Sequence, residues 1–290
     1  MAEVKKRKMK NRLSTRTNVI ITLTCAVIAV ALVLLVLYLV GIRYVKYNFE
    51  NGFSVTFVGM ADLDGAPRSG RLSYSGSDDV DGLTAEVSKK DGTVTYSNGD
   101  VYIGEMKDLV RHGKGKLTYE NGDVYEGTFI ADKPSGEGVL VFSNGDRYEG
   151  SFKNGRRHGE GKYTYADGSE YTGEFENGLK HGEGVYKSID GSVYEGSYKN
   201  NLKHGTGTFT YTDGSVYTGE FFEDMRCGIG TYTWANGEKY EGEFDENTLW
   251  GKGTYTWPDG RIYTGYFENG LIVRVDKEPA PETNTTEGEN

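Results

Sequence analysis

The sequence predicts an all-β fold: an elongated single-layer antiparallel β-meander of hairpin repeats, preceded by one N-terminal transmembrane α-helix. Three observations lead to this prediction. An uncharged apolar run occupies residues 19–42. A tyrosine recurs every 23 residues from Tyr102 to Tyr263. An Asn-Gly or Asp-Gly pair, the strongest local signal for a turn between strands, precedes each of these tyrosines.

The apolar run 19–42 is long enough to cross a membrane. As a helix it spans about 36 Å, against a hydrocarbon core of roughly 30 Å. Seven of the eight basic residues within 1–43 precede it, and basic flanks stay on the cytoplasmic side. We therefore expect a basic cytoplasmic segment 1–18, a single-pass helix 19–42 in the cell membrane, and the repeats outside.

Two other interpretations of the apolar run remain open. A cleaved signal peptide usually has an apolar core of about 7–15 residues and a small-residue cleavage site. A buried helix of a soluble protein would carry a polar face. The run 19–42 is longer than the apolar core of a signal peptide and lacks the polar face of a soluble helix, so we favour the uncleaved anchor.

The charge is divided unevenly along the chain. The net charge is −10, with +7 in residues 1–43 and −17 in residues 44–290. So acidic a region is expected to repel nucleic acid. Cys25 lies inside the apolar run and Cys227 far along the repeats, so we expect no disulfide between them.

Each repeat reads as two strands that share one aromatic and glycine-rich face. In the unit that begins at Tyr148, side-chain alternation places Tyr148, Gly150 and Phe152 on one side. After a loop at 153–158, a second strand places four residues on that face: Gly159, Gly161, Tyr163 and Tyr165. We expect rings to lie over bare glycine backbone, and the Asn-Gly and Asp-Gly pairs to form type I′ turns.

The repeat resembles a known family. Its pattern is Y-x-G-x-F-x-x-G-x-x-H-G-x-G-x-Y-x-Y-x-x-G, met almost residue for residue in Tyr171–Gly191. This pattern is similar to the MORN repeat (membrane occupation and recognition nexus), and the resemblance covers residues 89–272 as about eight repeats. It implies an elongated, twisted β-sheet used in scaffolding, and in some members in membrane association or self-association. The resemblance does not fix a function.

The sequence departs from the repeat at both ends of the array. Residues 43–88 read as a juxtamembrane segment with degenerate capping repeats, because Gly70–Tyr74 resembles a second strand without its preceding tyrosine. Residues 273–290 form an acidic, proline-containing tail that we expect to be disordered.

Two groups of residues are candidates for binding. Five cations share one repeat position, and stacked repeats are expected to align them in a basic loop rim: Arg111, Arg157, Lys180, Lys203 and Arg226. Such a rim meets an acidic polymer, a lipid headgroup or a partner's carboxylates, with simple solvation as the alternative. Three tryptophans cluster near the end of the array, at Trp234, Trp250 and Trp257. They suit sugar rings or a protein hot spot, although packing on neighbouring glycines is the favoured interpretation.

Metal binding and catalysis find less support. Four histidines share one repeat position: His112, His158, His181 and His204. Equivalent residues two strands apart are separated by about 9.6 Å, which is too far for imidazoles to share one zinc at roughly 2.0–2.1 Å. The G-x-G pieces precede strands rather than helices, and no catalytic motif stands outside the repeat. We therefore expect no metal, no cofactor and no enzyme activity.

The resulting hypothesis is a membrane-anchored, non-enzymatic scaffold. Its extended β-repeat surface would serve protein–protein interaction or self-association, with an unidentified protein or a second copy as partner. A surface carbohydrate or cell-wall binding module is one alternative, which would take a glycan or an acidic polymer. A membrane-tethering module that uses the basic rim is the other. Contact with the membrane would otherwise run through the helix at 19–42.

Overall fold

The computed structural model of the chain describes residues 2–62, 66–76, 81–88 and 92–275. These residues form one helix and 21 strands and fall into two compact units, 1–121 and 122–290. Within each unit, consecutive strands pair antiparallel. The prediction of an antiparallel meander with one N-terminal helix is confirmed.

The first unit carries the helix and seven strands. Their bounds are α1 Ala2–Leu39, β1 Ile42–Asn48, β2 Ser54–Ala61, β3 Pro67–Ser75, β4 Thr84–Ser88, β5 Thr93–Tyr96, β6 Val101–Lys107 and β7 Val110–Thr118. Strands β2 and β3 already have the geometry of a repeat. Gly59 pairs with Gly70, and the Phe57 ring lies against both glycines where a full repeat has tyrosine.

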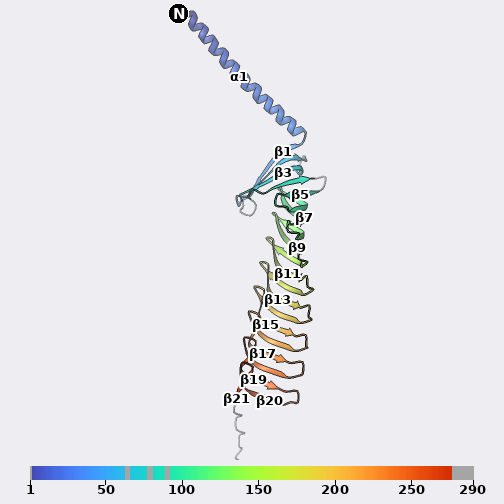
Figure 1. Cartoon of the computed structure of the whole chain (residues 1–290). Helices are drawn as coiled ribbons and strands as arrows, with labels where there is room; N and C mark the ends of the chain where they lie inside the picture. Colours follow the sequence, from blue (N-terminus) through green and yellow to red (C-terminus); the bar gives the residue numbers. More distant parts are fainter. Residues whose placement is uncertain (1, 63–65, 77–80, 89–91, 276–290) are drawn as a thin grey trace, which may run out of the picture. The chain divides into compact units, whose positions relative to one another are not determined.

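The second unit consists of fourteen described strands, which Figure 1 shows following one another in chain order. Their bounds are β8 Val124–Ile130, β9 Lys133–Val141, β10 Arg147–Lys153, β11 Arg156–Thr164, β12 Glu170–Glu176, β13 Leu179–Lys187, β14 Val193–Lys199, β15 Leu202–Thr210, β16 Val216–Phe222, β17 Met225–Thr233, β18 Lys239–Asp245, β19 Thr248–Thr256, β20 Ile262–Glu268 and β21 Leu271–Val275. The predicted acidic tail falls on 276–290, outside the described residues, and its first residues, 273–275, belong to β21.

Helix α1 is longer at its start and shorter at its end than the predicted range 19–42. It runs through Ala2–Leu39, and its stretch Thr15–Leu39 is long and apolar enough to span a membrane. Gly41 ends it with a left-handed φ of +84°, which suits a residue just after a helix. Apolar side chains such as Leu32, 56% exposed, face outward, whereas a core helix would bury them. The length and composition fit a membrane anchor or a signal sequence.

Glycine pairs run from strand to strand through the second unit. Gly150 pairs with Gly161, which pairs on its other side with Gly173, and the pattern continues along the unit. The Tyr148 ring lies over this pair, so that a Cβ on Gly161 would stand 2.6 Å from Tyr148 Cζ. The Tyr148 hydroxyl donates to the Ser151 carbonyl at 2.9 Å. The prediction that rings cover bare glycine backbone is confirmed.

The turns differ from the sequence prediction. At Asn144-Gly145 only the glycine has a positive φ, +96°, and its N–H donates to the Phe142 carbonyl at 3.0 Å. This is a type I turn followed by a left-handed glycine, not type I′. The Asn144 side chain explains the residue choice, because its Oδ1 accepts the N–H of Asp146 at 3.0 Å.

Type I′ geometry belongs to the other turn of the repeat. Asn154 and Gly155 both have positive φ, +52° and +81°, and join β10 to β11. The second strand therefore starts at Arg156, inside the predicted loop 153–158. A bulge between Gly150 and Phe152 absorbs the change in register. This correction moves the basic residue of each repeat from a loop onto a strand.

Candidate binding face

One face of the second unit carries nearly all of its aromatic rings, and we call it the aromatic face. Its buried inner row contains the repeating tyrosine and the aromatic four residues later. Tyr148 meets Phe152 and Phe175 edge-on, with ring centroids 5.1 and 5.0 Å apart. The same contacts link Tyr171, Tyr194, Tyr217 and Tyr240 to their neighbours. Edge-to-face packing is favourable for the ring quadrupoles, so this buried row forms a rigid layer beneath the exposed rings.

A second row of rings on the aromatic face remains half-exposed. It comes from the ends of the second strands and the turns that follow: Phe142, Tyr163, Tyr165, Tyr186, Phe209, Tyr211, Tyr232, Trp234, Tyr255 and Trp257. Successive members contact each other at a tilt, as Tyr211 and Tyr232 do with centroids 5.6 Å apart and ring planes 40° apart. The Tyr163 hydroxyl also donates to Asp146 Oδ2 at 2.6 Å and lowers the pKa of that carboxyl.

Four of the five predicted cations lie between these two rows. Arg157 is the cross-strand partner of Phe152, and the equivalent residues pair in the same way. Because cross-strand partners project from the same side of a sheet, four cations project from the aromatic face: Arg157, Lys180, Lys203 and Arg226. We call them the cation row. They are half-buried on strands β11, β13, β15 and β17 rather than exposed on a loop rim. The fifth, Arg111, belongs to the first unit, where its guanidinium lies 5.4 Å from the centre of the Tyr96 ring.

Each member of the cation row lies over several rings. The Arg157 guanidinium lies 4.9 Å from the Tyr163 ring centre and 5.4 Å from that of Phe175. Lys180 Nζ lies 5.1–5.4 Å from three ring centres, those of Tyr171, Tyr186 and Tyr198. Cation–π attraction at such distances holds the charge on the face without neutralising it.

The four cations differ in what else holds them. Arg157 donates to the Gly178 carbonyl at 2.7 Å, and Arg226 donates to the Asn247 carbonyl at 2.6 Å. Lys203 Nζ is 3.7 Å from Asp224. Lys180 has no ion-pair partner within the described part of the chain, and burial lowers the pKa of its amine. Among the described residues, the Lys180 ammonium is therefore held by ring contacts, without a hydrogen bond or an ion pair.

The cation row has defined ends. The position of Arg157 is taken by Pro134 on β9 and by Leu249 on β19, paired with Phe129 and Phe244. Past Arg226 the cation position is thus apolar. The half-exposed rings there are Trp234, Tyr255 and Trp257, and the Arg261 guanidinium, paired with Asp259, lies 5.0 Å from the Trp257 ring centre. A ligand that lay along the whole face would meet charge first and indole rings next.

The three tryptophans do not form one cluster. Trp234 and Trp257 contact Tyr255 from either side, at 5.4 and 4.9 Å between centroids, within the half-exposed row. Trp250 pairs with Glu243 on the opposite face, where 36% of its surface is exposed. The structure therefore brings Trp234 and Trp257 together with the cation row and separates Trp250 from both.

The histidines also lie on the opposite face, beside the short turns. His181 Nε2 is 3.5 Å from Glu176 Oε2, and the His204 ring is 5.3 Å from that of Phe222. Within the described ranges, no three potential ligands stand close enough to hold a metal ion.

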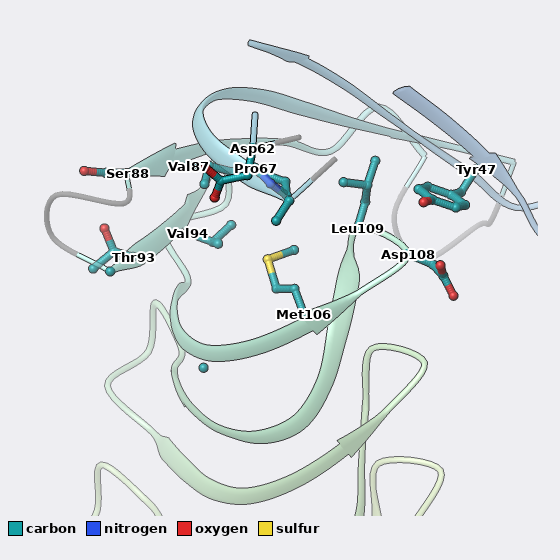
Figure 2. Close-up of a pocket in the computed structure, with 13 residues that line it drawn as sticks. Tyr47, Asp62, Pro67, Val87, Ser88, Thr93, Val94, Met106, Asp108 and Leu109 are labelled. Atoms are coloured by element: carbon teal, nitrogen blue, oxygen red, sulfur yellow. The ribbon is translucent and has the colours of Figure 1, made fainter. Parts of the chain in front are cut away.

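Sequence reasoning missed two features. The first is the half-exposed aromatic row, whose sequence signal was aromatic residues at alternate positions after the glycines, such as Tyr163 and Tyr165. The second feature is an open cavity of about 490 Å³ in the first unit, into which Met106 points in Figure 2. Met106 replaces the usual aromatic residue, and Leu109 beside it is buried with a left-handed φ of +66°. The replacement of the usual repeat residues by Met106 and Leu109 was the sequence signal for this cavity.

Comparison with known proteins identifies the repeats but no specific relative. The profile of the MORN repeat matches seven consecutive segments: 102–124, 125–147, 148–170, 171–193, 194–216, 217–239 and 240–260. The unit that starts at Tyr263 lies beyond the match. A search of curated proteins gave no match.

Solved structures show only distant likeness. A Drosophila melanogaster SAS-4 (dCPAP) TCP domain, in complex with a proline-rich motif of Ana2, is 18% identical with a TM-score of 0.35, over 54% of this chain and 85% of that one. A streptogramin B lyase is 13% identical with a TM-score of 0.17, over 79% and 84% of the two chains. Staphylococcus aureus virginiamycin B lyase gives the same identity and TM-score, over 79% and 85%. Scores this low carry no inference about binding or activity.

The family rests instead on the match from residue 102 to residue 260, which spans more than half of the 290 residues. The glycine pairs and the ring that covers them recur through the same span. The chain belongs to the MORN repeat family.

Proposed function

We propose that this protein is a membrane-anchored, non-enzymatic interaction module whose aromatic face binds an extended acidic segment of a partner protein. The cation row, half-buried between two rows of rings, is the observation that carries the proposal. The positive-inside bias of the residues before the helix supports an orientation with the N-terminus in the cytoplasm and the repeats outside.

The spacing of the cation row selects the shape of the ligand. The four cations stand on every second strand, so neighbours are separated by about 9.6 Å. A polyproline II helix advances about 9.3 Å per turn of three residues, which places every third side chain on one side at nearly that interval. A β-strand peptide turns residues i and i+3 to opposite sides. The row therefore fits acidic residues at every third position of a polyproline II segment.

The chemistry of the face agrees with that ligand. Exposed tyrosine and tryptophan rings form the usual grooves for polyproline II segments, which lose little entropy on binding. A carboxylate that reaches Lys180 finds an ammonium without an ion-pair partner in the described chain, and such charge-assisted contacts are stronger than neutral ones. Charge selects the partner and the rings hold its backbone.

The residues expected to form the binding surfaces for the two alternative functions do not lie together as those functions require. A glycan platform needed Trp250 beside the other tryptophans, but Trp250 lies on the opposite face. A lipid tether needed cations projecting from loops, but Lys203, for example, has only 23% of its side chain exposed. The geometry therefore favours a linear ligand that enters the face over a flat membrane that touches its border.

The test uses the full chain in detergent micelles and a fluorescent (Glu-Pro-Pro) repeat peptide of about 15 residues. We expect saturable binding, monitored by anisotropy, that weakens at least tenfold in the double variant Lys180→Glu/Lys203→Glu. The matched control is Lys187→Glu/Lys199→Glu, which makes the same charge change at exposed positions of the opposite face. Equal weakening in both variants, or binding unaffected by either, contradicts the proposal.

A further inference from the structure

We infer that the acidic segment 276–290 of this same chain is a resident ligand of the aromatic face and competes there with external partners. The inference rests on the proposed function and names one occupant of its site. The segment reads DKEPAPETNTTEGEN, with five acidic residues against one lysine. It supplies carboxylates and prolines, but its glutamates at 282, 287 and 289 do not follow the every-third spacing, so we expect it to bind more weakly than the (Glu-Pro-Pro) peptide.

The segment begins at the end of the aromatic face where the tryptophan rings lie. Strand β21 ends at Val275, and the nearest rings of the half-exposed row are those of Trp257, Tyr255 and Trp234. Leu249 occupies the cation position there. The first part of the segment carries Pro279, Ala280 and Pro281, so apolar residues of the segment meet indole rings and a leucine.

The acidic part of the segment then meets the cation row. From β21 to Arg226 on β17 is four strand spacings, about 19 Å, which a polyproline II chain covers in about six residues. Glu282 is thus within reach of Arg226. From β21 to Lys180 on β13 is about 38 Å by the same spacing, within reach of Glu287 and Glu289. The order of chemistry along the segment thus matches the order along the face.

Attachment to the array strengthens the contact. A ligand joined by a short linker has an effective concentration in the millimolar range, so weak individual contacts suffice for occupancy. External acidic segments must then displace the resident one. The face would be reserved for partners that bind more tightly, or for conditions such as higher salt that weaken the charge pairs.

The first experiment compares the full chain with a chain that ends at Val275, both in detergent micelles. A fluorescent peptide of sequence 276–290 is the probe. We expect it to bind the shortened chain at least tenfold more tightly than the full chain, because the resident segment no longer competes. The triple variant Glu282→Gln/Glu287→Gln/Glu289→Gln keeps the full length and is expected to behave like the shortened chain.

The second experiment locates the segment directly. A photo-crosslinking amino acid replaces Thr283 in the full chain, and the crosslinked product is mapped by mass spectrometry. Crosslinks to strands β15–β19 on the aromatic face, in the monomeric band, support the inference. Crosslinks found only between two chains, or on the opposite face, overturn it.

The outcomes separate this inference from the function on which it rests. If the (Glu-Pro-Pro) peptide binds full and shortened chains equally while the 276–290 peptide binds neither, the resident ligand is wrong and the proposed function stands. If neither peptide binds the shortened chain, both are wrong.

Discussion

The residue that decides the fold is the glycine beneath each tyrosine. Tyr148 is fully buried because Gly150 and Gly161 leave its ring room to lie flat across two strands. The ring restores the apolar contact that glycine lacks, and its hydroxyl satisfies the Ser151 carbonyl. This contact between a tyrosine ring and glycine backbone recurs from repeat to repeat.

Gly161→Ala tests that contact. The added Cβ would stand 2.6 Å from Tyr148 Cζ, and overpacking of this kind typically costs about 1–3 kcal/mol. We expect a lower thermal unfolding midpoint, measured by circular dichroism. Lys162→Ala, the next residue and on the opposite face, is the control and should leave the midpoint nearly unchanged. A Gly161→Ala protein as stable as the parent would refute the packing argument.

Tyr148→Phe isolates the hydroxyl. The ring stays, but the Ser151 carbonyl loses its donor, which costs about 1–3 kcal/mol for a buried acceptor. Denaturant unfolding should show the loss with an unchanged slope. No loss would mean that water satisfies the carbonyl as well as the tyrosine does.

At the scale of the element, each hairpin is closed by a turn whose geometry the residue types only partly reveal. The sequence predicted the strand pairs and the shared aromatic face of the repeats from Tyr102 onward, because period-2 alternation locked to a constant repeat leaves few other arrangements. It placed type I′ turns at pairs such as Asn144-Gly145, since Asn-Gly favours type I′ and also fits a type I turn with a left-handed glycine. The short hairpin turn was predicted as a longer loop, 153–158, because its residues vary from Asn154-Gly155 in one repeat to Ala131-Asp132 in another, although all four have positive φ.

The same limit applies to the binding face. Equal spacing was enough to align the cations, but their side depended on where the second strand starts. With the strand starting at Arg156 rather than Gly159, Arg157 faces Phe152 and lies among rings instead of on a loop. Trp250 is separated from Trp234 and Trp257 for the related reason that it stands next to the cation position, on the opposite face.

Ala131→Asn tests the reassigned turn. Ala131 has a φ of +47°, a conformation that costs an ordinary residue roughly 1–2 kcal/mol and that asparagine tolerates. We expect Ala131→Asn to raise the unfolding midpoint, and Asn154→Ala, its counterpart in the next repeat with φ +52°, to lower it. Both substitutions are exposed, so altered packing does not confuse the result. Shifts in the reverse directions would place the type I′ turn elsewhere.

At the scale of the whole molecule, the repeated tyrosine gives stability a common dependence on pH. Burial raises the pKa of Tyr148 and of Tyr240 from 10.0 to about 12. A raised folded-state pKa means that this stabilisation is complete below about pH 10 and is lost as the pH rises toward 12. We expect cooperative alkaline unfolding in that window, followed by tyrosinate absorbance and circular dichroism together. Tyrosinate appearing near pH 10 before any loss of β-structure would show that the rings are accessible.

The proposed orientation in the membrane is also a property of the whole chain. Thr172 is exposed on the opposite face, so Thr172→Cys in a Cys227→Ser background offers a reporter on the array. We expect a membrane-impermeant maleimide to label it equally in intact and permeabilised cells. Labelling only after permeabilisation would place the repeats in the cytoplasm, and release of the labelled chain from the membrane would indicate a cleaved signal sequence.

The central claim is that cation spacing on the aromatic face selects a polyproline II ligand with acidic residues at every third position. The most direct measurement is calorimetry with two peptides of identical composition, one with glutamate at every third position and one with the same glutamates at every fourth. We expect the first peptide to bind at least tenfold more tightly to the chain that ends at Val275. Equal affinities would show that the face responds to total charge alone, without regard to the spacing of the glutamates.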